Sequence, residues 1–194
     1  MRRLGIALVV LVVFFFAMRP DVFLTFTNVR NILYQGAILA IIAGAQSLVM
    51  VVGDFDLSVA ATSALAGAAT ASLMLGGMPV VLAILIALAV GLLIGIANGL
   101  LVAYLNLSAF VATLATLTSV TGLAYLVTEG TTLFNLPPEF NALGQGRFLE
   151  IPLPVFFAIA ILLILWFVLK YTTLGRRWYA TGGNVEVSRL SGVN

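Results

Sequence analysis

Between Arg30 and Glu129 the chain carries only two charged side chains, Asp54 and Asp56, and long apolar runs dominate the rest of this stretch. A helix needs roughly twenty apolar residues to cross a bilayer, and several runs reach that length. Only 8% of the 194 residues are charged, whereas roughly a quarter are charged in a typical soluble domain. We therefore predict an integral membrane protein. Because the runs are continuous and do not alternate, they indicate an all-α fold, a polytopic bundle of transmembrane helices, and not a β-barrel.

The apolar runs predict about six spans, with room for broken or re-entrant helices among them. The spans lie roughly at residues 4–18, 32–52, 57–76, 80–104, 109–128 and 151–170. The first run also has the length of a signal peptide, but no small-residue cleavage site precedes Arg19, so we predict a retained helix. Residues 21–30 have the composition of a loop, residues 129–150 form a longer polar loop, and residues 171–194 form a polar tail.

Basic residues cluster at both ends of the chain, at Arg2, Arg3, Arg176, Arg177 and Arg189. Lys and Arg are enriched in the cytoplasmic segments of membrane proteins, so both ends are predicted to be cytoplasmic. An even number of spans agrees with this, and it makes loop 129–150 periplasmic. The same topology places Asp54 and Asp56 near the inner face, unless the helices around them are broken or re-entrant.

The chain contains no cysteine and no histidine. This composition excludes disulfides, thiolate or imidazole metal ligands and His-based catalytic triads. The sequence also has no Walker A arrangement for phosphate binding and no Gly-x-Ser-x-Gly nucleophile motif. We therefore predict a chain that is not an enzyme, with no catalytic residues and no metal site. Its formal net charge of +2 is too small to point to nucleic acid, and no nucleic-acid partner is expected.

The two acids lie in a short segment, Gly53 to Val59, between two predicted spans. A charge at membrane depth is costly, so such a residue usually faces a polar cavity or the bundle interior and marks a functional site. The alternative is an interfacial turn, in which Gly53 permits the bend and both carboxylates stay in water. The residues alone leave both interpretations open.

Polar residues in the spans extend this segment into a candidate solute pathway or gate, which comprises Asp54, Asp56, Ser58, Gln46, Asn98 and Thr113. The carboxylates would accept hydrogen bonds from solute hydroxyls. Amides in spans also bond to neighbouring helices, and hydroxyls also bond the carbonyl one turn back, so structural roles stay open. Gly91, Gly95 and Gly99 form overlapping GxxxG steps, which predict close helix packing within the chain or with a second copy.

Several blocks of residues share their order and spacing with a known family. The blocks comprise Gly53, Asp56, Leu57, Ser58 and Val59; Gly95, Asn98 and Gly99; Ile151, Pro152 and Pro154; and Thr173, Gly175, Arg176, Tyr179, Gly182, Gly183, Asn184, Arg189, Leu190 and Gly192. On these blocks the chain resembles the ribose-type permease family of bacterial ABC importers. It departs from the family pattern at Ala60, Thr121, Val187 and Ser188.

The resemblance implies the N-terminal portion of a longer permease subunit in the bacterial inner membrane, which moves a sugar or a related small polar solute. It implies four partners: a cytoplasmic ATP-binding subunit, a second permease copy or paralogue, a periplasmic solute-binding protein and the lipid bilayer. No cofactor is expected on this chain, because the partner subunit would use ATP and Mg. A secondary transporter that uses an intramembrane acid, and a nonfunctional truncated permease, are the alternatives.

Within the tail, the resemblance implies an ATPase-coupling segment formed by Gly182, Gly183, Asn184, Glu186, Arg189, Leu190 and Gly192. In this interpretation the two glycines make a turn, Asn184 caps a helix, and residues 186–192 form a short amphipathic helix that docks on the ATP-binding subunit. The alternative is a basic anchor on anionic lipid.

Overall fold

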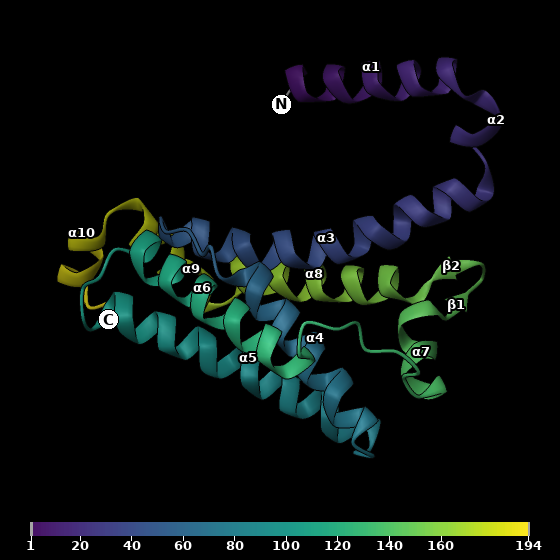
Figure 1. Ribbon diagram of the computed structural model, residues 1–194. Coiled ribbons are helices and arrows are strands. Elements are labelled where there is room, and N and C mark those ends of the chain that lie inside the picture. Colours follow the sequence, from purple (N-terminus) through teal and green to yellow (C-terminus); the bar gives the residue numbers. More distant parts are fainter. Residues whose placement is uncertain (1, 194) are drawn as a thin grey trace.

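The chain folds into a bundle of helices with one short β-hairpin (Figure 1). The computed structural model describes residues 2–193. Its helices are α1 (Arg2–Met18), α2 (Pro20–Phe23), α3 (Phe26–Val52), α4 (Val59–Leu75), α5 (Val80–Ala103), α6 (Ala109–Thr128), α7 (Pro138–Gln145), α8 (Leu153–Tyr171), α9 (Thr173–Gly183) and α10 (Val185–Leu190). The hairpin joins β1 (Arg147–Phe148) to β2 (Ile151–Pro152). The predicted polytopic helical bundle is confirmed.

Four of these helices, α3, α5, α6 and α8, are long and apolar enough to cross a membrane. Helices α1 and α4 are also apolar, and each has 17 residues. Large apolar side chains are exposed along α1, α3, α5, α6 and α8, as lipid contact requires, whereas α4 exposes only Leu75 at its end. Apart from the start of α3, each of the six helices begins and ends within two residues of a predicted span.

The predicted loop at residues 21–30 is wrong, because two helices occupy most of it. Pro20 is the first residue of α2, where its fixed φ favours a helix start and its missing N–H is no loss. Thr25 then caps α3, since its Oγ1 accepts a hydrogen bond from the Asn28 N–H at 3.3 Å. Helix α3 therefore begins at Phe26 and not at Ile32.

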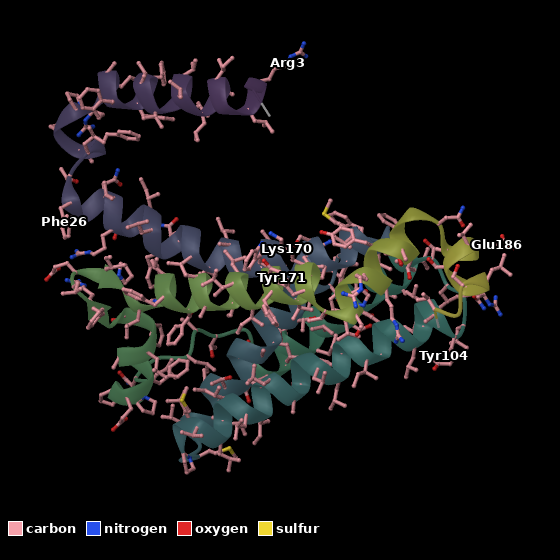
Figure 2. The ribbon with its side chains drawn as sticks, turned by 180° about the vertical axis from the view of Figure 1, so that it is seen from behind. Arg3, Phe26, Tyr104, Lys170, Tyr171 and Glu186 are labelled. Carbon is pink, nitrogen blue, oxygen red and sulfur yellow. The ribbon has the colours of Figure 1, made fainter. Side chains whose placement is uncertain are left out.

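The bundle divides into two groups of helices. In one group, α4 packs against α5 and α6 around a small core of Ala61, Leu65 and Val120. In the other, α3 packs along α8 and also contacts α9, as the parallel ribbons of α3 and α8 in Figure 1 illustrate. Helix α1 contacts α2 and lies apart from the rest of the bundle in both views (Figures 1 and 2).

Two glycines set how closely α3 approaches its neighbours, and we call them the glycine seam. A Cβ at Gly44 would lie 2.8 Å from Leu162 Cδ2 of α8. A Cβ at Gly182, in the last turn of α9, would collide with the carbonyl oxygen of Val51 near the end of α3. The prediction that Gly182 and Gly183 make a turn is wrong, since both are helical residues of α9 and Gly182 serves a close approach.

The two ends of the bundle carry different segments. Glu186 in α10 and Tyr104 after α5 lie at one end, whereas Phe26 at the start of α3 lies at the other (Figure 2). The second end also carries α7 and the hairpin, whose turn residues Leu149 and Glu150 have φ values of 49° and 66°. Two successive positive φ values are typical of a tight hairpin turn. Loop 129–150 and helix α10 of the tail thus lie at opposite ends of the molecule.

Candidate functional site

The acidic segment turns back into the bundle after α3 ends. Gly53 has a φ of 98°, the left-handed conformation that glycine adopts without strain. The Gln46 side chain, with its amide oriented by its partners, donates to the Asp56 carbonyl and accepts from the Asp56 N–H, both at 3.1 Å. Gln46 precedes the end of α3 at Val52 by roughly 9 Å of helix rise. The segment is therefore re-entrant, and Asp56 lies deeper in the bundle than the end of α3.

Asp56 begins a chain of hydrogen bonds that runs across three helices. Its Oδ1 accepts from the backbone N–H and the hydroxyl of Ser58, each at 2.7 Å. The Ser58 hydroxyl accepts in turn from Asn98 Nδ2 of α5 at 2.9 Å. Asn98 Oδ1 then accepts from the Thr116 hydroxyl of α6 at 2.6 Å. Asp56 thus fixes the start of α4 through Ser58, and Ser58 and Asn98 continue the hydrogen bonds to α5 and α6.

A second contact fixes the re-entrant segment to α6. The Leu57 N–H donates to Thr113 Oγ1 at 3.1 Å, and the same hydroxyl donates to the Ala109 carbonyl at 2.7 Å. We call the resulting set of six side chains the polar clamp: Gln46, Asp56, Ser58, Asn98, Thr113 and Thr116. Ser58, Thr113 and Asn98 are only 1%, 3% and 6% exposed. The polar clamp therefore joins α3, α4, α5 and α6. Three of its side chains are buried, whereas Gln46, Asp56 and Thr116 are half-buried.

The structure separates the two acids that the sequence places side by side. Asp54 is exposed, and its backbone N–H donates to the Val49 carbonyl at 3.2 Å, which helps to end α3. It lines a cavity of about 370 Å³ with Phe55 and with Ser108 and Phe110 near the start of α6. Five of the six predicted pathway residues thus come together in the polar clamp, and Asp54 lies outside it.

A second cavity, of about 420 Å³, lies between α4 and α5 beside the polar clamp. Its lining includes Asp56, Thr62 and Ser63 from the α4 side, and Gly91, Gly95 and Asn98 of α5. The Thr62 hydroxyl oxygen is buried and has no hydrogen-bond partner among residues 2–193. We call this space the α4–α5 cavity.

The GxxxG glycines do not pack closely against a helix of this chain. A Cβ at Gly95 or Gly99 would meet no atom of the described residues within 4 Å, and one at Gly91 would meet Thr62 Cγ2 at 3.9 Å. Gly91 and Gly95 line the α4–α5 cavity. The predicted close packing within the chain is therefore not observed, and packing against a second copy stays a prediction.

Thr116 and Thr62 belong to this region but were not predicted from the sequence as candidate site residues. Thr116 follows Thr113 by one helical turn, and Thr62 follows Ser58 by one turn. Residues three or four apart share a helix face, so this spacing is a signal that identifies both. The spacing does not by itself predict that Thr116 has a partner on α5 while Thr62 has none among residues 2–193.

The predicted coupling segment comprises the last two residues of α9, the junction at Asn184 and helix α10. Asn184 Oδ1 accepts from the Val187 N–H at 3.0 Å, so the predicted cap of the last helix is present. Gly192, with a φ of 81°, follows that helix. Leu190 is 84% exposed. Glu186 and Arg189 are exposed as well, so the segment presents a mixed apolar and charged surface at the end of the bundle.

Comparison with known proteins gives consistent matches over nearly the whole chain. The family described as branched-chain amino acid transport system / permease component matches residues 28–194. The ribose import permease protein of Haemophilus influenzae is 37% identical over 100% of this chain and 61% of its own length. That of Bacillus subtilis is 39% identical with the same coverage. The D-allose transport system permease protein of Escherichia coli is 34% identical over 96% of this chain and 58% of its own length.

The chain thus spans about three fifths of the length of these relatives. No solved structure matches it.

Proposed function

The chain belongs to the family described as branched-chain amino acid transport system / permease component, and from this premise we propose that it is the membrane-spanning part of a sugar importer. It is a multi-pass inner-membrane protein of the permease type. In our proposal a separate cytoplasmic subunit hydrolyses ATP with Mg, and a periplasmic protein delivers the solute. A second permease copy or paralogue completes the pathway.

The observation that carries this proposal is the 37–39% identity to ribose import permeases along the whole chain. The chemical composition of the polar clamp also supports the proposal. Apart from Asp56 its side chains are neutral amides and hydroxyls, which exchange hydrogen bonds with a polar uncharged solute at little electrostatic cost. A gate built on such bonds can open and close without separating a buried ion pair.

We further propose that α9 and α10 dock on the ATP-binding subunit and pass its movement to the polar clamp. Gly182 abuts the Val51 carbonyl at the end of α3, so a displacement of α9 pushes directly on α3. Gln46 lies on that same helix and holds both backbone polar groups of Asp56. The proposed path therefore runs from α9 through α3 to the re-entrant segment. Both chain ends are cytoplasmic in this proposal.

Affinity purification from native membranes in mild detergent, followed by mass spectrometry, tests the proposal. We expect an ATP-binding subunit to be retained with the chain. Leu190→Asp is expected to lose that subunit, because it puts a charge on the proposed docking surface. The matched control is Leu149→Asp at the opposite end, since both leucines are highly exposed, at 84% and 80%.

Three outcomes separate the alternatives. Loss of the ATP-binding subunit with Leu149→Asp, and not with Leu190→Asp, would reverse the proposed orientation. Retention of no ATP-binding subunit, together with uptake that a protonophore abolishes at constant ATP, would favour the secondary transporter. If no ATP-binding subunit is retained and no solute uptake depends on the gene, the result would support the alternative of a nonfunctional permease.

A further inference from the structure

We propose that a pocket between α3 and the β1–β2 hairpin binds the phosphate headgroup of an anionic phospholipid. We call it the two-arginine pocket, and its lining comprises Arg30, Asn31, Tyr34, Gln145, Arg147 and Pro152. It lies at the end of the bundle that carries Phe26, α7 and the hairpin (Figures 1 and 2). Such a lipid site is separate from the polar clamp and from the proposed docking surface on α9 and α10.

The lining of the pocket has the chemistry of an anion site. All five of its polar side chains carry hydrogen-bond donors, and two of these, Arg30 and Arg147, are permanently cationic. No Asp or Glu among residues 2–193 is part of this lining. A guanidinium presents its N–H groups in a planar fork that matches two oxygens of a phosphate or carboxylate. The lining therefore favours a ligand with several negatively charged oxygens.

Glu150 supplies only part of the opposite charge. Its Oε2 lies 3.9 Å from Nη1 of Arg30 and 3.9 Å from Nη1 of Arg147. Both contacts are longer than a charge-assisted hydrogen bond, which measures roughly 2.7–2.9 Å. Arg19 is the only arginine among residues 2–193 whose guanidinium donates a hydrogen bond to another of these residues. One carboxylate shared by two guanidinium groups therefore leaves a positive charge, and N–H donors that a ligand can use.

The pocket lies where two membrane spans begin. Arg30 and Asn31 directly precede the apolar run at residues 32–52. Pro152 directly precedes Leu153, the first residue of α8. Both α3 and α8 are long and apolar enough to cross a membrane. The pocket is therefore placed near the level of the lipid headgroups, which is where arginine side chains at helix ends extend their charge.

Exposed apolar side chains beside the arginines favour a lipid over a free phosphate. Phe26 and Leu33 lie about one turn before and after Arg30, so they share its face of α3. Both are exposed, as is Phe148 in β1. The Arg30 guanidinium lies 5.9 Å from the centroid of the Phe26 ring. A phospholipid has acyl chains that cover such side chains, whereas a free phosphate would leave them uncovered.

The size of the pocket agrees with a headgroup. Its volume is about 270 Å³, slightly below the range of roughly 300–1,000 Å³ that holds whole small molecules. The pocket can therefore enclose the charged part of a lipid, while the acyl chains lie outside along α3.

Native mass spectrometry tests the site on the full chain, purified in mild detergent with the subunits that it retains. Phosphatidylglycerol, which is anionic, and phosphatidylcholine, which is zwitterionic, are added in equal amounts, and the ratio of the two bound lipids is measured. We expect the wild type to favour phosphatidylglycerol. Arg30→Gln and Arg147→Gln should each lower the ratio by about fivefold, the contribution typical of one basic residue at an anionic membrane surface.

Arg19→Gln is the matched control for these two variants. It removes the same charge directly before α2, outside the pocket, where Arg19 Nε donates to Asp21 Oδ1. We expect it to leave the lipid ratio unchanged. An equal fall in the Arg19 and Arg30 variants, or no preference in the wild type, would mean that no specific headgroup site exists and would overturn the proposal.

Glu150→Gln separates lipid binding from a structural role of the ion pairs. It removes the competing carboxylate and keeps the size of the side chain, so we expect the ratio to rise. If the two arginines and Glu150 only hold the hairpin on α3, thermal unfolding in lipid-free detergent will show a loss of stability and the ratio will not change. That outcome would overturn the proposal. Because the ratio compares two lipids on the same folded protein, partial unfolding of a variant does not alter it.

Two further outcomes identify other occupants. Soluble glycerol 3-phosphate has the phosphate but no acyl chains, so we expect it to leave bound phosphatidylglycerol in place even in large excess. Displacement of the lipid at equal concentration would assign the pocket to a free phosphate. If the arginine variants keep the wild-type ratio and Arg147→Gln instead loses a soluble protein that the wild type retains, the pocket binds a protein partner. Either result would show that the proposed lipid site is wrong.

Discussion

The glycine seam and the polar clamp join helices in two different ways. At the seam, Gly44 and Gly182 let α3 approach α8 and α9 until backbone or leucine atoms fill the space of a missing side chain. At the clamp, Asn98 and its partners bridge helices through hydrogen bonds and need no such approach. An apolar side chain gains little by packing on another helix instead of on lipid tails. Helices within membranes therefore associate through close packing at small residues and through interhelical hydrogen bonds. We therefore expect added side-chain volume to destabilise the glycine seam, and removal of a hydrogen-bond partner to destabilise the polar clamp.

Gly182→Ala is expected to have the largest effect of the variants that test this comparison. The added methyl group collides with the backbone at Val51, which cannot move aside as a flexible side chain could. We expect the free energy of unfolding to fall by about 3 kcal/mol, measured by SDS titration in mixed micelles. Gly183→Ala is the matched control, because a Cβ there meets nothing within 4 Å. Equal stability of the two variants would refute the seam at α9.

Asn98→Ala tests the polar clamp and should cost about 2 kcal/mol, because it removes two interhelical hydrogen bonds at a buried position. Thr116→Ala should cost less, since it removes one of them. The double variant should be less destabilised than the sum of the two, because both single variants break the same Asn98–Thr116 bond. Thr118→Ala is the control, since that hydroxyl bonds only to carbonyls of its own helix. Strict additivity in the cycle would contradict the clamp.

Gly44→Ala should destabilise the chain by about 1 kcal/mol, less than Gly182→Ala, because the nearest atoms are the ends of Leu162 and Leu165, which can shift. The comparison variant is Gly36→Ala in the same helix, where no atom lies within 4 Å. We expect Gly36→Ala to be neutral or slightly stabilising, since alanine favours a helix over glycine. SDS titration of both proteins checks the difference, and a greater loss at Gly36 would argue against the seam at α8.

Asp54→Ala should have the smallest effect, within about 0.5 kcal/mol, because the side chain is exposed and the bond of Asp54 to the Val49 carbonyl uses its backbone N–H, which the substitution keeps. Asp56→Ala, by contrast, removes the acceptor of two Ser58 hydrogen bonds and should destabilise the start of α4. Unfolding of the two variants in parallel measures how unequal the neighbouring acids are. Similar losses would mean that Asp54 also has a partner in the membrane.

The prediction from sequence succeeded where composition decides the outcome. Apolar runs are long enough to identify α5, α6 and α8 almost to the residue, because lipid requires an apolar helix of a given length. The loop at residues 21–30 was predicted wrongly because the cap at Thr25 is a local hydrogen bond that hydropathy does not register. Similarly, the GxxxG spacing identifies a smooth helix face, but it does not say whether a helix, a cavity or a second copy covers that face.

By itself, the sequence determined the membrane class, the approximate helices, the absence of thiol and imidazole chemistry, and the family. It also singled out the polar residues that lipid would penalise, and five of the six lie together. Only the tertiary structure decided which acid joins the polar clamp, that the acidic segment is re-entrant, and that Gly182 packs on α3. The physical reason is that hydropathy and helix length are properties of single segments. Hydrogen bonds between helices and close approach require two segments, and the partners in the Ser58–Asn98 and Leu57–Thr113 bonds lie 40 or more residues apart in the sequence.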